Sequence, residues 1–296
     1  MKIKSKEDTI VNIVSIALTT IFAIICLYPI IYCLSMSFSS DDAIVKGTVW
    51  LLPRGINFES YKLLFSDKMF WRSLFNSVMY TVLGTILSLF GNLTLGYVLS
   101  RPKFIFKKAL NIYILIPMLF SGGLIPTFLI IKSLGLYNTI WAIILPGSVG
   151  IWNCILVKTF FKTTISDGVI EAAYMDGANH FQILGYIVLP LSKTIIAIIG
   201  LFTAVGIWND YFNALIYITD KQLYPLQLYL KDILSAQTNM ANISGILNSS
   251  DYVKNLVNSQ RIKYVLIIVS TVPIALVYPF VQKYFVKGIM LGSIKE

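Results

Sequence analysis

Long apolar runs separated by polar connections divide this chain of 296 residues. A helix needs about 20 consecutive, mostly apolar residues to cross the hydrocarbon core of a bilayer. Runs of about that length predict six transmembrane helices, at 11–35, 73–100, 110–131, 139–160, 194–218 and 264–285. The expected fold class is therefore an all-α integral membrane protein.

The polar segments between these runs give the expected domain organisation. A tail of residues 1–10 leads into the first helix at 11–35, and a long connection covers 36–72. Five further helices form one transmembrane domain at 73–285, and a short tail of 286–296 follows. Six spans place both termini on the same side of the membrane.

One segment between two predicted spans, 166–190, has the pattern of two short helices with a tight joint. Gly177 suits the left-handed residue that ends a helix. Asn179, followed by Gln182 three residues later, predicts a capping box that opens the next helix. Pro190 limits how far that second helix can run unbroken, because proline lacks the backbone N–H.

Asp176 is expected in the last turn of the first short helix. A negative charge there opposes the helix dipole. An acid in an unfavourable place indicates a partner outside the helix, whereas the alternative is a solvated turn with an incidental acid. The spacing leaves both interpretations open.

Composition and charge agree with a membrane protein. The chain is 56% hydrophobic and 13% charged, with a mean hydropathy of +0.75, whereas a soluble domain has about a quarter charged residues. The formal charge of +10 comes from Lys and Arg spread among the polar segments, so topology explains it better than nucleic-acid binding. The loop 101–108 holds four basic residues in eight and is assigned to the cytoplasm, with both termini and 166–190.

Signals for enzymatic chemistry are weak. His180 is the one histidine, no metal-ligand cluster of His, Cys and carboxylates occurs, and no phosphate-binding loop is present. Three cysteines in or beside apolar runs are expected to be buried thiols: Cys26, Cys33 and Cys154. We expect no enzyme activity and no cofactor or metal bound by this chain, so any ATP and Mg²⁺ belong to a partner.

Trp208, Asn209 and Asp210 form a polar, aromatic cluster in the fifth predicted span. Charges inside a span cost free energy and usually face the bundle interior or a water-filled path. This predicts a translocation path. The alternative is an interfacial residue in an aromatic belt, since Ile218 lies only eight residues further.

The motif Glu-Ala-Ala-x-x-Asp-Gly-Ala at 171–178, with Leu189-Pro190 downstream, resembles the permease subunits of bacterial ABC importers. The resemblance covers nearly the whole chain, and its closest branch is the carbohydrate, maltose-type one, at Phe58–Tyr61, Asn76-Ser77, Tyr97–Arg101, Trp208–Asp210 and Lys287-Gly288. Three further stretches are similar to permeases for complex oligo- and polysaccharides: 120–126, 137–141 and 223–227. Ser166 and Thr194 depart from the family pattern, which commonly has proline there.

This resemblance implies the type I ABC importer permease fold, with cytoplasmic coupling helices at 166–190, in a bacterial cell membrane. It also implies a second homologous permease subunit, cytoplasmic ATPase subunits and an extracytoplasmic sugar-binding protein. Glu171 and Asp176 are then polar contacts to the ATPase, and small residues allow close packing. The implied coupling residues are Glu171, Ala172, Ala173, Asp176, Gly177, Ala178, Asn179, Leu189 and Pro190.

The function expected is ATP-driven import of oligosaccharide or polysaccharide fragments by alternating access. An importer permease for a non-sugar solute is the milder alternative, against which the Trp-Asn-Asp pattern argues. An ion-coupled carrier is a second alternative, and it predicts inverted repeats and charge pairs at the middle of the membrane. A membrane-embedded enzyme is a third, which the weak enzymatic signals disfavour.

Overall fold

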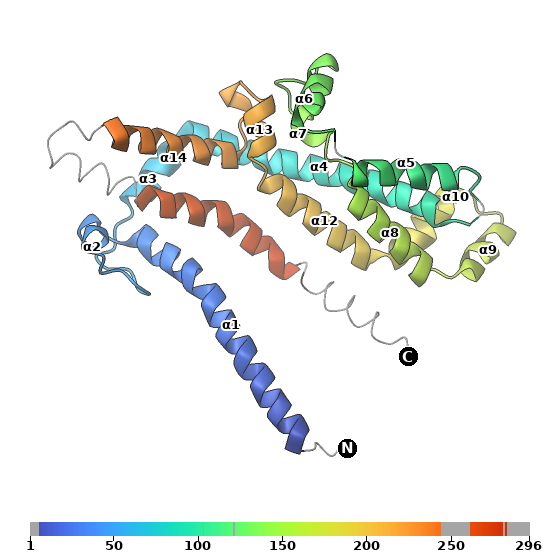
Figure 1. The fold of residues 1–296 in the computed structure, drawn as a ribbon, viewed down its shortest axis with the longest axis horizontal. Coiled ribbons are helices and arrows are strands. Elements are labelled where there is room, and N and C mark those ends of the chain that lie inside the picture. The colour runs from blue at the N-terminus through green and yellow to red at the C-terminus, as the bar shows by residue number, and fades with distance from the viewer. Residues whose placement is uncertain (1–5, 103, 121, 244–260, 281, 283–296) are drawn as a thin grey trace. The chain divides into compact units, whose positions relative to one another are not determined.

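Helices and loops make up the part of the chain that the computed structural model describes, residues 6–102, 104–120, 122–243, 261–280 and 282 (Figure 1). No strand occurs in these ranges. The all-α prediction is therefore confirmed. Two compact units divide the chain: residues 1–68 with 232–273, and residues 69–231 with 274–296. We call them unit 1 and unit 2.

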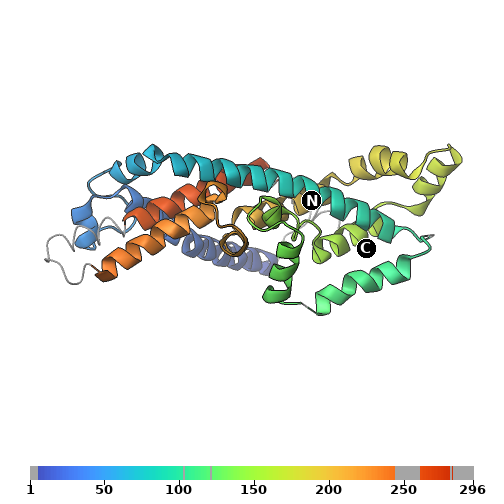
Figure 2. The same cartoon turned by 90° about the horizontal axis from the view of Figure 1, so that it is seen from above.

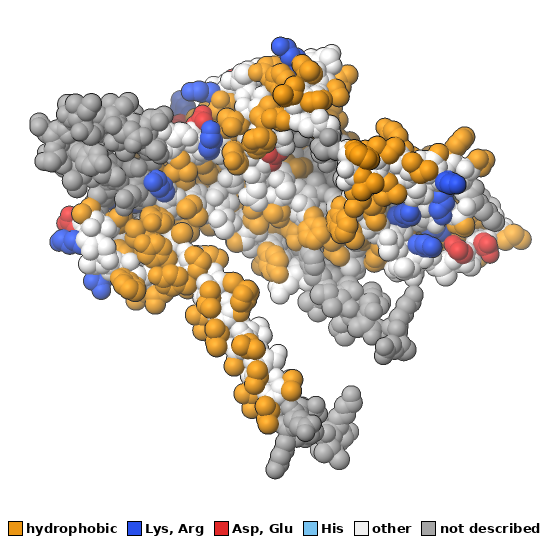
Figure 3. Space-filling view, viewed as in Figure 1, with side chains coloured by type: hydrophobic (Ala, Val, Ile, Leu, Met, Phe, Trp, Pro, Cys, Tyr) orange, Lys and Arg blue, Asp and Glu red, His pale blue; other side chains and the backbone are white. Residues whose placement is uncertain are grey.

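Unit 1 begins with α1 (Lys6–Phe38), a 33-residue helix. Apolar side chains surround it and are exposed along most of its length, as Figure 3 shows. Such a helix suits a lipid environment. Cys26 is exposed on this surface, so the expectation of a buried thiol is wrong there, while Cys154 in unit 2 is buried.

The connection after α1 is not irregular throughout, because it contains α2 (Asp41–Val45) and α3 (Glu59–Ser66). Two hydrogen bonds hold this connection against the end of α1. Ser35 Oγ donates to the Leu51 carbonyl at 2.6 Å, and Tyr61 Oη donates to Ser37 Oγ at 2.9 Å. A later helix, Arg261–Phe280, contributes Tyr264, whose ring meets that of Tyr32 edge-on at 5.9 Å.

Unit 2 is organised around α4, as both views of the ribbon show (Figures 1 and 2). The helices in chain order are α4 (Lys68–Ser100), α5 (Lys107–Leu119), α6 (Leu124–Ser133), α7 (Trp141–Ile144), α8 (Ile151–Thr164), α9 (Asp167–Met175), α10 (His180–Gln182), the π-helix η1 (Ile183–Val188), α11 (Leu189–Leu191), α12 (Lys193–Trp208), α13 (Phe212–Tyr217), the 3₁₀ turn η2 (Lys221–Leu223) and α14 (Leu226–Ile243). The unit boundary falls at the start of α4 and within α14.

Glycines allow α4 to approach its neighbours closely. A Cβ added at Gly96 would lie 2.5 Å from Val157 Cγ1 on α8, and one added at Gly84 would overlap Ile207 on α12. Small residues at such crossings are typical of helix packing in membranes. Gly122, Gly123 and Gly147 do not act this way, because a Cβ there would meet nothing within 4 Å.

The number of spans stays a prediction. Among the described residues, three helices are long and apolar enough to cross a membrane: Thr9–Phe38, Lys68–Ser100 and Arg261–Phe280. Two bent pairs raise this to at most five: α5 with α6, bent by 120°, and 180–191 with α12, bent by 83°. The predicted span at 139–160 is divided between α7 and α8, on either side of Pro146-Gly147.

Part of the predicted organisation lies outside the described residues. This applies to the start of the N-terminal tail at 1–5, to the end of the last predicted span at 283–285, and to the tail 286–296 with Lys287-Gly288.

Candidate functional site

The helix end at Gly177 has the geometry that the sequence predicts. Asp176 is the C-terminal cap of α9, and Gly177 follows with a φ of +80°. The Gly177 N–H donates to the Tyr174 carbonyl at 3.0 Å, and the Ala178 N–H donates to the Ala173 carbonyl at 2.9 Å. These two bonds form a Schellman motif, which needs a left-handed residue where Gly177 stands.

The next helix begins with the predicted capping box. The Gln182 N–H donates to Asn179 Oδ1 at 2.9 Å, and the Asn179 N–H donates to Gln182 Oε1 at 2.8 Å. Each bond satisfies a backbone donor that the helix start would otherwise leave unpaired. Only 176–179 separate the two helices, and both helix ends are fixed by hydrogen bonds. The geometry of the joint is therefore fixed by hydrogen bonds to its backbone groups.

Pro190 affects the helix before it as well as after it. In a regular α-helix its ring would clash with the carbonyl of Tyr186, four residues earlier. The chain adopts the wider π-helix at 183–188 instead, then continues as α11 and stops at Ser192, before the bend into α12. The prediction that Pro190 limits the helix is confirmed, with the end one residue later.

The inner face of α9 rests on the ends of longer helices. Ile170 and Ala173 are buried in a cluster with residues of α4, α8, η1 and α12: Leu93, Tyr97, Val157, Phe161, Ile165, Ile183, Val188, Ile195 and Ile199. Both views place α9 and α10 at the end of unit 2 where α4 finishes (Figures 1 and 2). Any displacement of α9 therefore acts directly on these helices.

The outer face of the joint is exposed and combines acids with apolar groups. Glu171 and Asp176 are exposed, and neither carboxylate makes a hydrogen bond or ion pair with a described residue. Met175 is 89% exposed and Phe181 is 86% exposed. Ala172 lies on this outer face, whereas Ala173 is inside the chain's own core.

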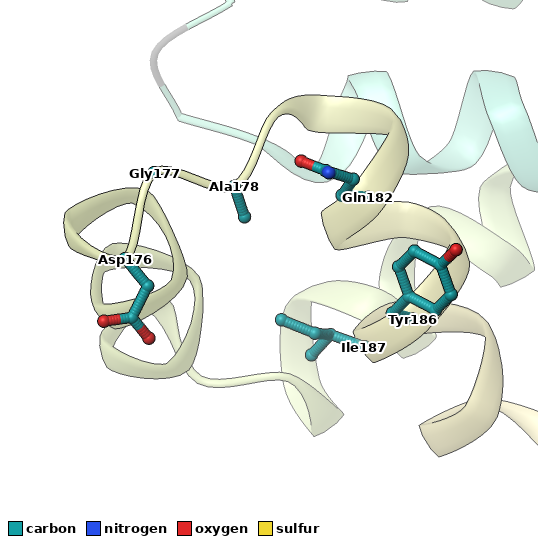
Figure 4. A pocket seen from close by; sticks show the side chains of 6 residues that line it. All are labelled: Asp176, Gly177, Ala178, Gln182, Tyr186 and Ile187. Atoms are coloured by element: carbon teal, nitrogen blue, oxygen red, sulfur yellow. The ribbon is translucent and has the colours of Figure 1, made fainter.

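A shallow hollow of about 300 Å³ lies between the two short helices (Figure 4). Ala178 and Ile187 point into it, and the Asp176 carboxylate stands at its rim. The hollow is lined by Asp176, Gly177, Ala178, Gln182, Tyr186 and Ile187.

His180 has a structural partner across the joint. Its Nδ1 lies 2.8 Å from the Tyr174 hydroxyl, and the two rings meet edge-on at 5.5 Å. Tyr174 belongs to α9 and His180 to α10, so this contact joins the two short helices.

Arg101 belongs to the site by its contacts, although its sequence pattern predicts only a place in the basic loop and in the stretch Tyr97–Arg101. It follows the last residue of α4, it is buried, and its Nη1 lies 3.8 Å from Asp167 Oδ1 at the start of α9. Its guanidinium lies 5.4 Å from the centre of the Tyr97 ring, and its Nε donates to Ser100 Oγ at 3.0 Å. The signal in the sequence is an arginine immediately after a long apolar helix.

The Trp208–Asp210 cluster lies at the break between α12 and α13. Asp210 Oδ1 accepts from the Asn213 N–H at 3.1 Å, and Asp210 Oδ2 accepts from Asn213 Nδ2 at 2.6 Å. Trp208 is buried and Asn209 is exposed, so the three residues do not share one surface. Asp210 therefore stabilises the first turn of α13 from the position before its N-cap residue, Tyr211. Its place in a translocation path stays a prediction.

Long apolar helices with an exposed two-helix joint at their ends define a helical membrane protein. Residues 81–291 match the family of the binding-protein-dependent transport system inner membrane component, and the chain belongs to this family. It is accordingly a membrane permease subunit of an ABC transport system, and not itself an enzyme.

Relatives agree over almost the full length. The chain is 40% identical to the polygalacturonan/rhamnogalacturonan transport system permease protein YtcP of Bacillus subtilis, over 93% of this chain and 94% of that protein. It is 38% identical to protein LplC of the same organism, over 92% and 90%. A crystal structure of a bacterial ABC transporter involved in the import of the acidic polysaccharide alginate contains a chain with a TM-score of 0.82 and 37% identity, covering 96% of this chain and all of that one.

Proposed function

We propose that this chain is the transmembrane permease subunit of an ATP-driven importer that brings oligosaccharide or polysaccharide fragments into a bacterial cell by alternating access. The names of YtcP and of the alginate transporter support this substrate class, and they favour acidic fragments within it. The observation that carries the coupling part is the joint at 176–179, exposed outside and packed inside on the long helices.

The joint transmits motion because it has little freedom of its own. Both helix ends are closed by backbone hydrogen bonds, so a force applied at Asp176 or Glu171 moves the joint as one body. Ile170 and Ala173 pass that movement to α4, α8 and α12 through the buried cluster. The coupling residues of the proposal are Glu171, Ala172, Ala173, Asp176, Gly177, Ala178, Asn179, Leu189 and Pro190.

The partners of the proposal are a second homologous permease, cytoplasmic ATPase subunits that bind ATP and Mg²⁺, and an extracytoplasmic sugar-binding protein. The proposal has six spans, a transport domain at 73–285, and both termini and 166–190 in the cytoplasm. Trp208, Asn209 and Asp210 are assigned to the region of the path, where Asp210 fixes the break between α12 and α13.

The test is reconstitution of the complete complex in proteoliposomes, with the binding protein outside and ATP inside. We expect ATP-dependent uptake of galacturonate or alginate oligosaccharides. The double variant Glu171→Lys/Asp176→Lys should stay in the membrane but lose the ATPase subunit on copurification. Asp42→Lys, at an exposed acid of unit 1, is the matched control and should keep it.

Transport by this chain alone, without ATP, would overturn the importer proposal in favour of an ion-coupled carrier. Normal ATPase binding by the Glu171→Lys/Asp176→Lys variant would overturn the assignment of the joint while leaving the substrate class untouched.

A further inference from the structure

A group of cations gathers at one end of unit 2, where α5 begins and α8 ends. Figure 3 shows Lys and Arg side chains together over these helices, with acidic side chains beside them on α9. Lys107 lies within electrostatic range of three other cations of the group. We call the group the basic cluster, and its members are Arg101, Lys107, Lys158 and Lys162.

Neutral acceptors hold the basic cluster together. Lys158 Nζ donates to Asn111 Oδ1 at 2.6 Å, which joins α8 to α5. Lys107 Nζ donates to the Arg101 carbonyl at 3.0 Å. Among the described residues, the only carboxylate within 4.0 Å of the cluster is that of Asp167, beside Arg101, and its side chain is 69% exposed. The cluster therefore has a large excess of positive charge.

Exposed apolar side chains surround the same place. Ile105 is 88% exposed and Phe106 is 68% exposed, directly before Lys107, and Tyr113 on the outer face of α5 is 72% exposed. Apolar side chains next to cations at the end of a membrane helix suit the boundary between headgroups and acyl chains. The basic cluster and the apolar side chains around it therefore form one surface that suits a ligand with both an anionic group and hydrocarbon chains.

We propose that the basic cluster binds the phosphate headgroup of an anionic phospholipid, whose acyl chains lie along the exposed face of α5. Basic groups between the ends of membrane helices are suited to anionic headgroups. An acidic surface on a partner protein fits less well, because it would also meet the exposed carboxylate of Asp167 and would leave Ile105 and Phe106 uncovered. This proposal depends on the membrane location of the chain and not on the coupling role of α9.

A lipid bound at the basic cluster would lie beside the contact between the end of α4 and α9. Arg101 belongs to the cluster and also faces Asp167 at the first turn of α9. A bound phosphate therefore sits next to the contact that ties the end of α4 to the joint. We expect bound anionic lipid to stabilise the packing of α9 against the end of α4.

The experiment compares lipid retention by the purified complex in native mass spectrometry, with phosphatidylglycerol and phosphatidylcholine supplied in equal amounts. The natural protein should retain phosphatidylglycerol in preference. The variant Lys158→Gln/Lys162→Gln should lose about 25-fold in that preference, from about 1 kcal/mol for each charge removed. Lys158→Arg/Lys162→Arg keeps the charge and the donor to Asn111, and it should keep the preference.

Two further variants separate lipid binding from folding and from total charge. Lys162→Gln alone changes an exposed side chain and should reduce the preference about fivefold. Lys132→Gln/Lys193→Gln removes two charges outside the cluster and should change nothing.

Three outcomes would overturn the proposal. The first is an unchanged preference in both cluster variants that carry glutamine. The second is displacement of the lipid by soluble glycerol phosphate, which would make the cluster a site for free phosphate. The third is loss of the ATPase subunit from Lys162→Gln with lipid retention intact, which would make the cluster a protein contact.

Discussion

Two joints between helices each place an acid at a break, and they treat that acid differently. At the first joint, 176–179, the backbone closes both helix ends and the Asp176 carboxylate has no partner among the described residues. At the second, the two carboxylate oxygens of Asp210 accept from the N–H and Nδ2 of Asn213 and so stabilise the first turn of α13.

This difference separates an acid that holds its own chain from an acid that is free for another chain. A cap stabilises a helix end when its oxygen accepts a backbone N–H, as Asp210 does. Asp176 stands at a C-terminal helix end, where its charge is unfavourable and gains nothing from the chain. We propose that Asp176 has an intermolecular partner, which would account for an acid at this position, whereas Asp210 already has Asn213 as its partner.

The largest effect should come from Gly177→Val. A β-branched residue is strained at a φ of +80°, so the Schellman motif should open and the joint should lose its fixed geometry. We expect ATP-dependent uptake to fall by at least about tenfold, from a strain of roughly 1–2 kcal/mol and the misplaced coupling surface. Gly177→Asn is the control, because asparagine tolerates this conformation, and it should retain most of the uptake. Equal activity of the two variants would show that the left-handed residue is not needed.

The second prediction concerns the contact between α4 and α8, on which α9 of the first joint packs, and it leaves the second joint unchanged. A Cβ at Gly96 would lie 2.5 Å from Val157 Cγ1 and 3.1 Å from the Lys158 backbone nitrogen, whereas one at Gly200 would lie 3.8 Å from its nearest neighbour, Leu89 Cδ1. Gly96→Ala should therefore be less stable than Gly200→Ala by about 1–3 kcal/mol, because overpacking affects only the first. The gain in helix propensity is common to both variants and cancels.

The measurement is thermal unfolding of the two purified variants in the same detergent. Equal unfolding temperatures would mean that α8 can move away from α4 at no cost, and the first joint would then lack a firm base.

The two acids themselves give the third prediction. Asp210→Ala should destabilise the protein by about 1 kcal/mol, the usual value of a helix cap. Asp176→Ala should leave the unfolding temperature unchanged but weaken binding of the ATPase subunit, measured by copurification at increasing dilution. The contrast fails if Asp176→Ala unfolds early or if Asp210→Ala is neutral.

Sequence patterns were sufficient for the first joint because its determinants are local. Gly177, Asn179 and Gln182 act on backbone groups within a few residues, so their spacing predicts the geometry. The same reasoning places Asp210 inside a span but does not identify Asn213 as its partner. An aspartate followed by an asparagine three residues later does not by itself predict a hydrogen bond between the two side chains.

Contacts between distant segments could not be predicted in the same way. The ion pair between Arg101 and Asp167 joins residues far apart in the chain, and the position of Arg101 after a long apolar helix does not identify Asp167 as its partner. The bends within predicted spans are similar, since Pro and Gly mark places where a helix can break without fixing the angle. Hydrophobicity therefore locates the apolar segments, while tertiary packing decides whether each runs straight.

The smallest effect should come from Asp167→Asn, which removes the charge tie between the end of α4 and the first joint. The Asp167 side chain is 69% exposed and lies 3.8 Å from Arg101, so solvent screens the pair and its loss should cost at most about 1 kcal/mol. Uptake should fall less than in Gly177→Val, and the difference from the natural protein should shrink as salt is raised. Uptake in proteoliposomes at low and high ionic strength measures both effects. A loss as large as that of Gly177→Val would mean that the ion pair, rather than the capped backbone, holds the first joint against the long helices. Arg101, instead of Gly177, would then be the residue that makes the two joints differ.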